Sequence, residues 1–314
     1  MQSRIGIIGA GMAGAWLANQ LTQAGHDVVV FEKSRGLGGR MATRRMDDIA
    51  FDHGAPFFTA STERFQELVS AQSDVCELWQ PRVVNIAAGS DPFPVEAPAV
   101  ERYVGVPGMG ALCKSLLDGV FVQRNFEVRE LVQATFGWQV IAADGTQAEV
   151  DWVISTAPAE QTLNLMPAAP LDDVAYHTCF ALMAYLDAAP AYDMAVVEDS
   201  ILEKLFVTAS RPGRAATPGL VAHATPEWSG SWFEQDRTLV AQEMEQALQA
   251  LGVQVGSAAS LQRWRYARVA TPHGNPYWIN KQAQLAACGD WGVGPNVEDA
   301  FTSANQLLAR ILNE

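Results

Sequence analysis

The chain has 314 residues, of which 49% are hydrophobic and 18% are charged, so it can bury a sizeable core and is long enough for two domains. Its 21 basic and 35 acidic residues give a net charge of -14, which argues against nucleic acid and anionic membrane surfaces as partners. The four cysteines are widely separated and form no pair at metal-binding spacing, which argues against a zinc site and a disulfide framework. We therefore expect reduced thiols in a cytoplasmic protein without a metal site.

The first 32 residues carry the clearest pattern in the chain. A short β-branched run over residues 5–8 is followed by three glycines in G-x-G-x-x-G spacing, an apolar helix and a second strand that ends in Glu32. This order predicts the start of a Rossmann-like domain that binds a dinucleotide. The residues expected to hold the pyrophosphate are those of the turn, Gly9, Gly11, Met12, Ala13 and Gly14.

Each glycine has a physical role in this arrangement. Gly9 permits the tight turn from strand to helix, Gly11 lets backbone N–H groups approach a pyrophosphate, and Gly14 lets the helix pack closely on the strand. The phosphate then lies at the positive end of the helix. Glu32 can accept hydrogen bonds from both ribose hydroxyls and would repel a free 2′-phosphate, a repulsion that the neighbouring Lys33 reduces.

The same stretch allows another reading. Between Arg4 and Asp27, His26 is the only ionisable side chain, so the run resembles a membrane span. Its several glycines and side-chain amides would be costly in hydrocarbon, and the three parts of a secretory signal are not clear. We therefore expect a protein without a membrane segment.

The remaining chain alternates between strand-like and helical patterns. An arginine-rich stretch over 35–45 precedes a predicted helix over 61–71 and a loop or hairpin over 85–100. We expect further helices to end near Gly119 and to span 236–252, with Asp236 as cap and Gly252 as stop. Strand-like runs are predicted at 120–122, 125–131, 137–145, 148–157, 179–186, 205–210 and 219–225, and a final strand, Gly-Asp turn and helix at 284–312.

Several motifs together resemble a known family. The stretches GAGMAGAWLA, VFEK, RGLGGRMATRR, WVISTAPA and ACGDWGVGPNVEDA resemble the flavoproteins of the amine oxidase superfamily, and DHGAPFFT, HATPEWS and RWRYA are similar to its bacterial renalase branch. The resemblance implies an α/β fold with a discontinuous Rossmann-like FAD-binding domain and an inserted α+β substrate domain on a mixed or antiparallel sheet. The expected limits are 1–60, 103–158 and 266–314 for the FAD domain and 61–102 and 159–265 for the substrate domain.

The resemblance also implies roles for individual residues. FAD would have its adenosine ribose on Glu32, beside Lys33, and its phosphates near Arg40, while the backbone of Val128 would meet the adenine. Asp290 would accept a ribityl hydroxyl, and the helix entered through Asn296 and Val297 would point its N-terminus at the flavin. Ala55 and Pro56 lie in the segment expected to pass the isoalloxazine. The candidates for the substrate pocket are Phe57, Phe58, Thr59, His223, Arg268 and Asn296.

The activity implied by the resemblance is oxidation of dihydronicotinamide isomers to NAD(P)+, with O2 reduced to hydrogen peroxide. Hydride transfer from a dihydropyridine needs no general base, so no catalytic side chain is named. Asn296 stands where bacterial renalases typically carry arginine, which bears on substrate binding. The alternatives are an amine oxidase or desaturase acting on a reduced carbon substrate, a non-catalytic flavin-binding protein and a plain NAD-dependent dehydrogenase. We expect a monomer or a dimer.

Overall fold

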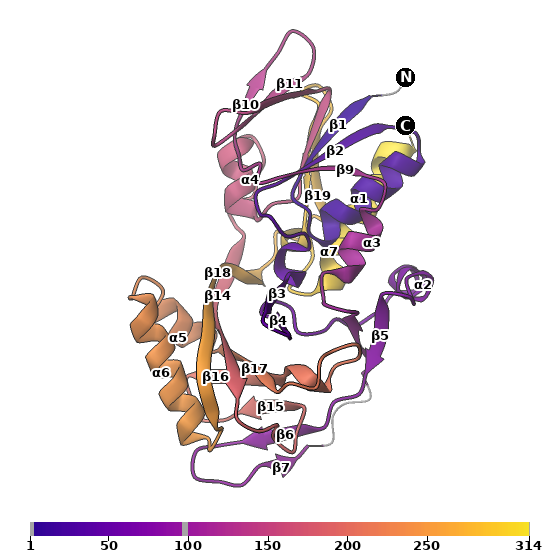
Figure 1. The fold of residues 1–314 in the computed structure, drawn as a ribbon. Coiled ribbons are helices and arrows are strands. Elements are labelled where there is room, and N and C mark those ends of the chain that lie inside the picture. The colour runs from indigo at the N-terminus through magenta and orange to yellow at the C-terminus, as the bar shows by residue number, and fades with distance from the viewer. Residues whose placement is uncertain (1–2, 96–99, 314) are drawn as a thin grey trace.

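The computed structural model describes residues 3–95 and 100–313, and it places them in two sheet-based bodies joined by long strands (Figure 1). The predicted loop or hairpin over 85–100 is partly described, because β6 (Val83–Ile86) and β7 (Phe93–Pro94) form an antiparallel pair. Residues 96–99 of that prediction lie outside the described residues.

The first body is built on a six-stranded sheet in the order β19-β20-β13-β1-β2-β9. Every neighbouring pair is parallel except the edge pair β19–β20. Buried β-branched and apolar side chains fill the central strands, as expected for a sheet covered on both faces. The strands are β1 Arg4–Ile8, β2 Asp27–Glu32, β9 Phe121–Arg124, β13 Trp152–Ser155, β19 Tyr277–Asn280 and β20 Leu285–Cys288.

Helices cover one face of this sheet and a small second sheet covers the other. On the first face α1 (Met12–Gln23) packs beside α7 (Val297–Leu312), with α3 (Ala111–Leu116) and α2 (Glu63–Ala71) nearby (Figure 1). Phe301 of α7 joins them through ring contacts with Trp16 and Phe65. The opposite face is covered by α4 and a three-stranded sheet, namely α4 Ala159–Leu165, β10 Val128–Gln133, β11 Trp138–Ala142 and β12 Gln147–Val150.

The second body is a seven-stranded sheet in the order β18-β14-β17-β16-β15-β6-β7. All its pairs are antiparallel except β6–β15. One face packs against α5 (Pro226–Ser231) and α6 (Arg237–Ala250), and the predicted cap of α6 is present because Asp236 accepts the N–H of Thr238. Its remaining strands are β14 Ala175–Leu186, β15 Met194–Val197, β16 Leu202–Val207, β17 Gly219–Ala224 and β18 Val255–Thr271.

The other face of this sheet turns toward the first body. Met183, Phe206 and Val221 share one hydrophobic cluster with residues of α1, α3 and α7, whereas their alternating neighbours pack under α6. Two short antiparallel pairs lie between the bodies, β3 (Thr43–Met46) with β4 (Ile49–Asp52), and β5 (Cys76–Trp79) with β8 (Arg102–Gly105) (Figure 1).

The predicted domain limits stay predictions, and two local features bear on them. The limit at 265/266 falls inside β18, a strand of 17 residues that belongs to the seven-stranded sheet throughout. The helix α2, which lies in the predicted substrate domain, packs on α7 of the first body through Phe65 and Phe301.

Candidate dinucleotide and substrate site

The glycine turn between β1 and α1 has the geometry of a pyrophosphate site. Gly9 has a positive φ of 105°, and a Cβ on Gly14 would come within 2.0 Å of the Gly9 carbonyl oxygen. A Cβ on Gly11, in contrast, would meet no atom within 4 Å. The turn is therefore closed where helix and strand touch and open at the helix N-terminus, where a phosphate is expected.

Glu32 lies at the carboxyl end of β2, beside this turn. Its side chain is 6% exposed and accepts the backbone N–H groups of Ala10, at 3.0 Å, and Ser34, at 2.8 Å. The Glu32 carbonyl accepts the N–H of Phe126, which brings the start of β10 and Val128 toward the same edge, and Lys33 is exposed beside it. A buried carboxylate fixed by two N–H donors is a preorganised acceptor for ribose hydroxyls.

Arg40 and Asp290 meet although 250 residues separate them. The guanidinium donates both Nη groups to the carboxylate, at 2.5 and 2.7 Å, and one of them also approaches the carbonyl of Tyr266. Although burial lowers the pKa of Arg40, the charge and hydrogen bonds of Asp290 raise it overall. The pair connects the loop after β2 with the turn after β20, and Arg40 also contacts β18. The residues predicted for the phosphates and for the ribityl chain, which are neighbouring groups of FAD, are therefore direct partners.

The N-terminus of α7 lies next to the segment over residues 53–62. Glu298, 6% exposed, accepts the backbone N–H and the hydroxyl of both Ser61 and Thr62, at distances from 2.6 to 3.1 Å. Asn296 is engaged in the helix cap, where its backbone and side-chain nitrogens donate to Asp299, and Val297 begins the helix. Glu298 therefore fastens the predicted flavin-facing segment to the helix end.

The segment from His53 to Thr59 is tied to both bodies. The N–H of Ala55 donates to the carbonyl of Arg40, and the carbonyl of His53 accepts the indole N–H of Trp264 at 3.0 Å. Ala55, Pro56, Phe57 and Thr59 are half-buried. Phe58, also a pocket candidate, is a buried side chain that packs on Phe65 and Tyr103.

Two histidines lie where this segment meets the seven-stranded sheet. His53 stacks on Trp264, and burial lowers its pKa to about 4, with a further contribution from the Arg44 charge. Burial likewise lowers the pKa of His223 to about 4, and the His53 backbone hydrogen-bonds to it. Both imidazoles are consequently neutral near pH 7.

A charged trio lies beside His223. Glu203 accepts Arg268 at 2.8 and 3.2 Å and Lys204 at 2.9 Å, and all three side chains are partly exposed. Their charges act on His223, and Lys204 is the register partner of His223 across the β16–β17 pair. Two cations and one carboxylate leave a positive excess at this place, in a chain whose net charge is -14.

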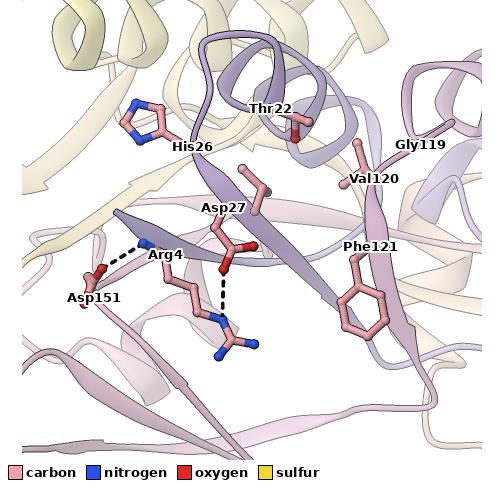
Figure 2. A pocket seen from close by; sticks show the side chains of 9 residues that line it. Arg4, Thr22, His26, Asp27, Gly119, Val120, Phe121 and Asp151 are labelled. Atoms are coloured by element: carbon pink, nitrogen blue, oxygen red, sulfur yellow. Dashed lines mark hydrogen bonds and ion pairs between the residues drawn. The ribbon is translucent and has the colours of Figure 1, made fainter. Parts of the chain in front are cut away.

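A separate hollow lies at the amino-terminal ends of the parallel strands, opposite the carboxyl ends that carry the glycine turn (Figure 2). It is lined by the starts of β1, β2 and β9, with Arg4 held between Asp27 and Asp151. Ligands of open α/β sheets bind at the carboxyl ends of the strands, so this shallow polar hollow is remote from the dinucleotide site. Within 3–95 and 100–313, no three His, Cys, Asp or Glu side chains gather as a metal site requires.

Comparison with known proteins agrees with this geometry. Residues 7–71 match the model of an NAD(P)-binding Rossmann-like domain. A 4,4'-diapophytoene desaturase of Staphylococcus aureus strain Newman is 33% identical over 85 residues, which make up 26% of this chain and 17% of the desaturase. The aligned part of the chain thus spans about a sixth of that relative.

Solved structures resemble the whole chain. A protein from Exiguobacterium sp. 255-15, provisionally called a protoporphyrinogen oxidase, has a TM-score of 0.80 at 13% identity and full coverage of both chains. A fatty acid isomerase from P. acnes that produces CLA has a TM-score of 0.77 at 13% identity, with 98% of each chain covered.

A putrescine oxidase variant completes the comparison. It has a TM-score of 0.74 at 13% identity, covering 100% of this chain and 99% of that one. The chain therefore shares the fold of these three solved proteins. The predicted fold class, a Rossmann-like domain with a sheet-rich substrate domain, is confirmed. In the part of the chain that the structure describes, no helix is both long and apolar enough to cross a bilayer.

Sequence reasoning missed two buried carboxylates and their partners. Glu298 reads as an ordinary acid in the first turn of a helix, and Asp52 as part of a turn before His53. Asp52 accepts Thr43, Met109 and the two arginines Arg211 and Arg214. The only available signal was an acid directly after the apolar pair Ala50–Phe51, and nothing local identified its partners.

Proposed function

We propose that the chain is an FAD-dependent oxidoreductase that oxidises a small reduced donor bound between the FAD domain and the seven-stranded sheet. The residues present fit FAD. Glu32 suits the adenosine ribose, the open space at Gly11 suits the pyrophosphate, and the Arg40–Asp290 pair suits the remaining phosphate and ribityl groups. Phe57 and Thr59 would lie at the flavin ring. When bound, FAD would supply a hydride acceptor that O2 can reoxidise.

The donor is an anionic dihydronicotinamide nucleotide, a 2- or 6-dihydro isomer of NAD(P). The observation that carries this assignment is the trio of Arg268, Lys204 and Glu203, whose excess positive charge attracts phosphate and repels a cationic amine. The products are NAD(P)+ and hydrogen peroxide.

The roles of the chain's residues in this reaction are binding and positioning. Arg268 pairs with a donor phosphate, and Glu203 holds the guanidinium in place through two hydrogen bonds. Trp264 and His53 form a stacked wall at the edge of the donor site. No side chain has to remove a proton, because a dihydropyridine becomes aromatic when it loses hydride alone.

Steady-state kinetics with an Arg268→Gln variant tests this assignment. We expect KM for the dihydronicotinamide isomers to rise about tenfold or more at nearly constant kcat, since a charge-assisted hydrogen bond contributes about 1.5–3 kcal/mol. Arg265→Gln is the matched control, because Arg265 is exposed and pairs with Glu234. Oxidation of putrescine by the wild type at rates above those for the isomers would contradict the proposal.

A further inference from the structure

The buried cluster of Asp52, Arg211 and Arg214 holds more positive charge than its single carboxylate balances. The exposed fractions of the three side chains are 0%, 1% and 2%. Arg211 Nη1 donates to Asp52 at 2.7 Å, and Arg214 donates to the same oxygen and to the Pro107 carbonyl. One positive charge therefore remains unbalanced within the cluster, although burying an unpaired charge is costly.

Asp52 has no capacity left to balance this charge. Its other oxygen accepts the hydroxyl of Thr43, at 2.5 Å, and the N–H of Met109, at 3.1 Å. The carboxylate thus receives four donors, two on each oxygen, which fills its lone pairs. Any further acceptor for the arginines has to come from elsewhere.

The free donors of Arg211 form one complete edge of its guanidinium. Nε and Nη2 are buried, and within the described residues neither has a hydrogen-bond partner. These two N–H groups point in parallel from the side of the guanidinium, which is the fork that binds carboxylate or phosphate with two hydrogen bonds. Nε of Arg214 is likewise buried without a partner.

Two aromatic rings lie near this guanidinium and connect it to the flavin-facing segment. The Arg211 guanidinium lies 5.2 Å from the centre of the Trp79 ring and 5.8 Å from that of Phe206. Trp79 also packs on Phe57, at 6.1 Å between ring centres, and Phe206 packs on His223, at 5.2 Å. One aromatic ring therefore separates Arg211 from each of two residues assigned to the donor site.

We propose that the Nε–Nη2 edge of Arg211 is a second anion subsite, which binds a carboxylate or phosphate oxygen pair of the electron donor between Trp79 and Phe206. The identity of the ligand as the donor rests on the proposed function, whereas the anion site itself does not. The edge is buried, so an anion reaches it only after a neighbouring side chain moves, and binding is slow compared with diffusion.

The competing account is that the two rings satisfy the N–H groups through their π faces and that the cluster only fastens the 208–214 loop to β4. In that case no anion binds at the cluster. Arg211→Lys separates the two accounts, since lysine keeps the charge and can pair with Asp52 but cannot present two parallel donors. Arg263→Lys is the matched control, because Arg263 also lies over an aromatic ring, 5.1 Å from the centre of Phe233.

The probes are benzoate and inorganic phosphate, added separately to the purified flavoprotein after long preincubation. We expect at least one of them to quench tryptophan fluorescence slowly and to raise Tm, with affinity reduced tenfold or more in Arg211→Lys and unchanged in Arg263→Lys. A response to benzoate alone indicates a carboxylate donor, and a response to phosphate alone indicates a phosphate group. No response in the wild type, or equal affinity in Arg211→Lys, overturns the proposal.

A second measurement keeps the test valid if Arg211→Lys does not fold. In wild-type protein labelled with 15N at arginine Nε, we expect a slowly exchanging buried Nε–H resonance to shift when the binding anion is added. Absence of any such shift overturns the proposal. Neither readout depends on turnover, so anion binding without flavin reduction by dihydronicotinamides would refute the proposed donor and leave the anion site standing.

Discussion

Replacing Gly11 and Gly14 separately by alanine tests the structural basis of dinucleotide binding. A Cβ at position 14 would lie 2.0 Å from the Gly9 carbonyl oxygen and 2.9 Å from the Thr156 hydroxyl. Backbone has to move by about 1 Å to relieve the first contact, and overpacking of this kind costs about 1–3 kcal/mol or more. We expect Gly14→Ala to lower Tm by about 6 °C or more.

Gly11→Ala is expected to behave in the opposite way. Gly11 has a φ of -82°, which alanine adopts freely, and its added Cβ would meet no protein atom within 4 Å. The methyl group would instead occupy the space where the pyrophosphate approaches the backbone. We expect the Tm of the apoprotein to change by less than about 2 °C and the Kd for FAD to rise about 100-fold.

Differential scanning calorimetry of the apoproteins and flavin titration by fluorescence quenching measure both effects. Thr22→Ala, in the last turn of the same helix, serves as a control for substitution in α1. Wild-type FAD affinity in Gly11→Ala would refute the reasoning, since it would mean that the pyrophosphate does not lie over this turn.

Three further predictions concern buried ionisable side chains. Glu32→Gln loses one charge-assisted acceptor and should weaken FAD binding about tenfold or more in the same titration. Glu245→Gln, in α6 of the second body, is the remote control, and unchanged affinity in Glu32→Gln would contradict the role of Glu32. Glu298→Ala leaves four donors of Ser61 and Thr62 without an acceptor and should lower the free energy of unfolding in urea by about 2–4 kcal/mol. A loss below about 1 kcal/mol would contradict the role of Glu298 as their acceptor. His53 and His223 have pKa values lowered to about 4, so the unfolded chain binds more protons between pH 6.5 and 4. The free energy of unfolding should therefore fall as pH drops through this window, by up to about 3 kcal/mol for each histidine. In urea unfolding at several pH values, His223→Gln should reduce this dependence on pH, whereas replacement of the exposed His177 should leave it unchanged.

Local sequence pattern predicted those parts of the fold in which neighbouring residues determine the structure. The turn at Gly9 and Gly14, the acid at the end of β2 and the cap at Asp236 each follow from the conformational needs of a few consecutive residues. The seventeen-residue strand β18 was not among the predicted strands, because its structure depends on pairing with the distant strand β14.

The candidate site was less predictable, because its decisive contacts join distant parts of the chain. Arg40 and Asp290 were each predicted near a cofactor, but their direct pairing depends on how the loop after β2 meets the turn after β20. The partners of Asp52 lie more than 150 residues away, at Arg211 and Arg214. The burial of Phe58, one of the pocket candidates, was also not predictable locally, because it depends on packing against Phe65 and Tyr103.

The anaerobic visible spectrum of the purified protein, recorded before and after addition of 2- and 6-dihydro-NAD, tests the central claim most directly. Pure NADH and putrescine, added separately, are the controls. The account predicts a bound flavin spectrum that the isomers bleach rapidly and the controls do not, with peroxide formed when oxygen returns. Bleaching by putrescine alone, or a flavin that the isomers leave oxidised, would contradict it.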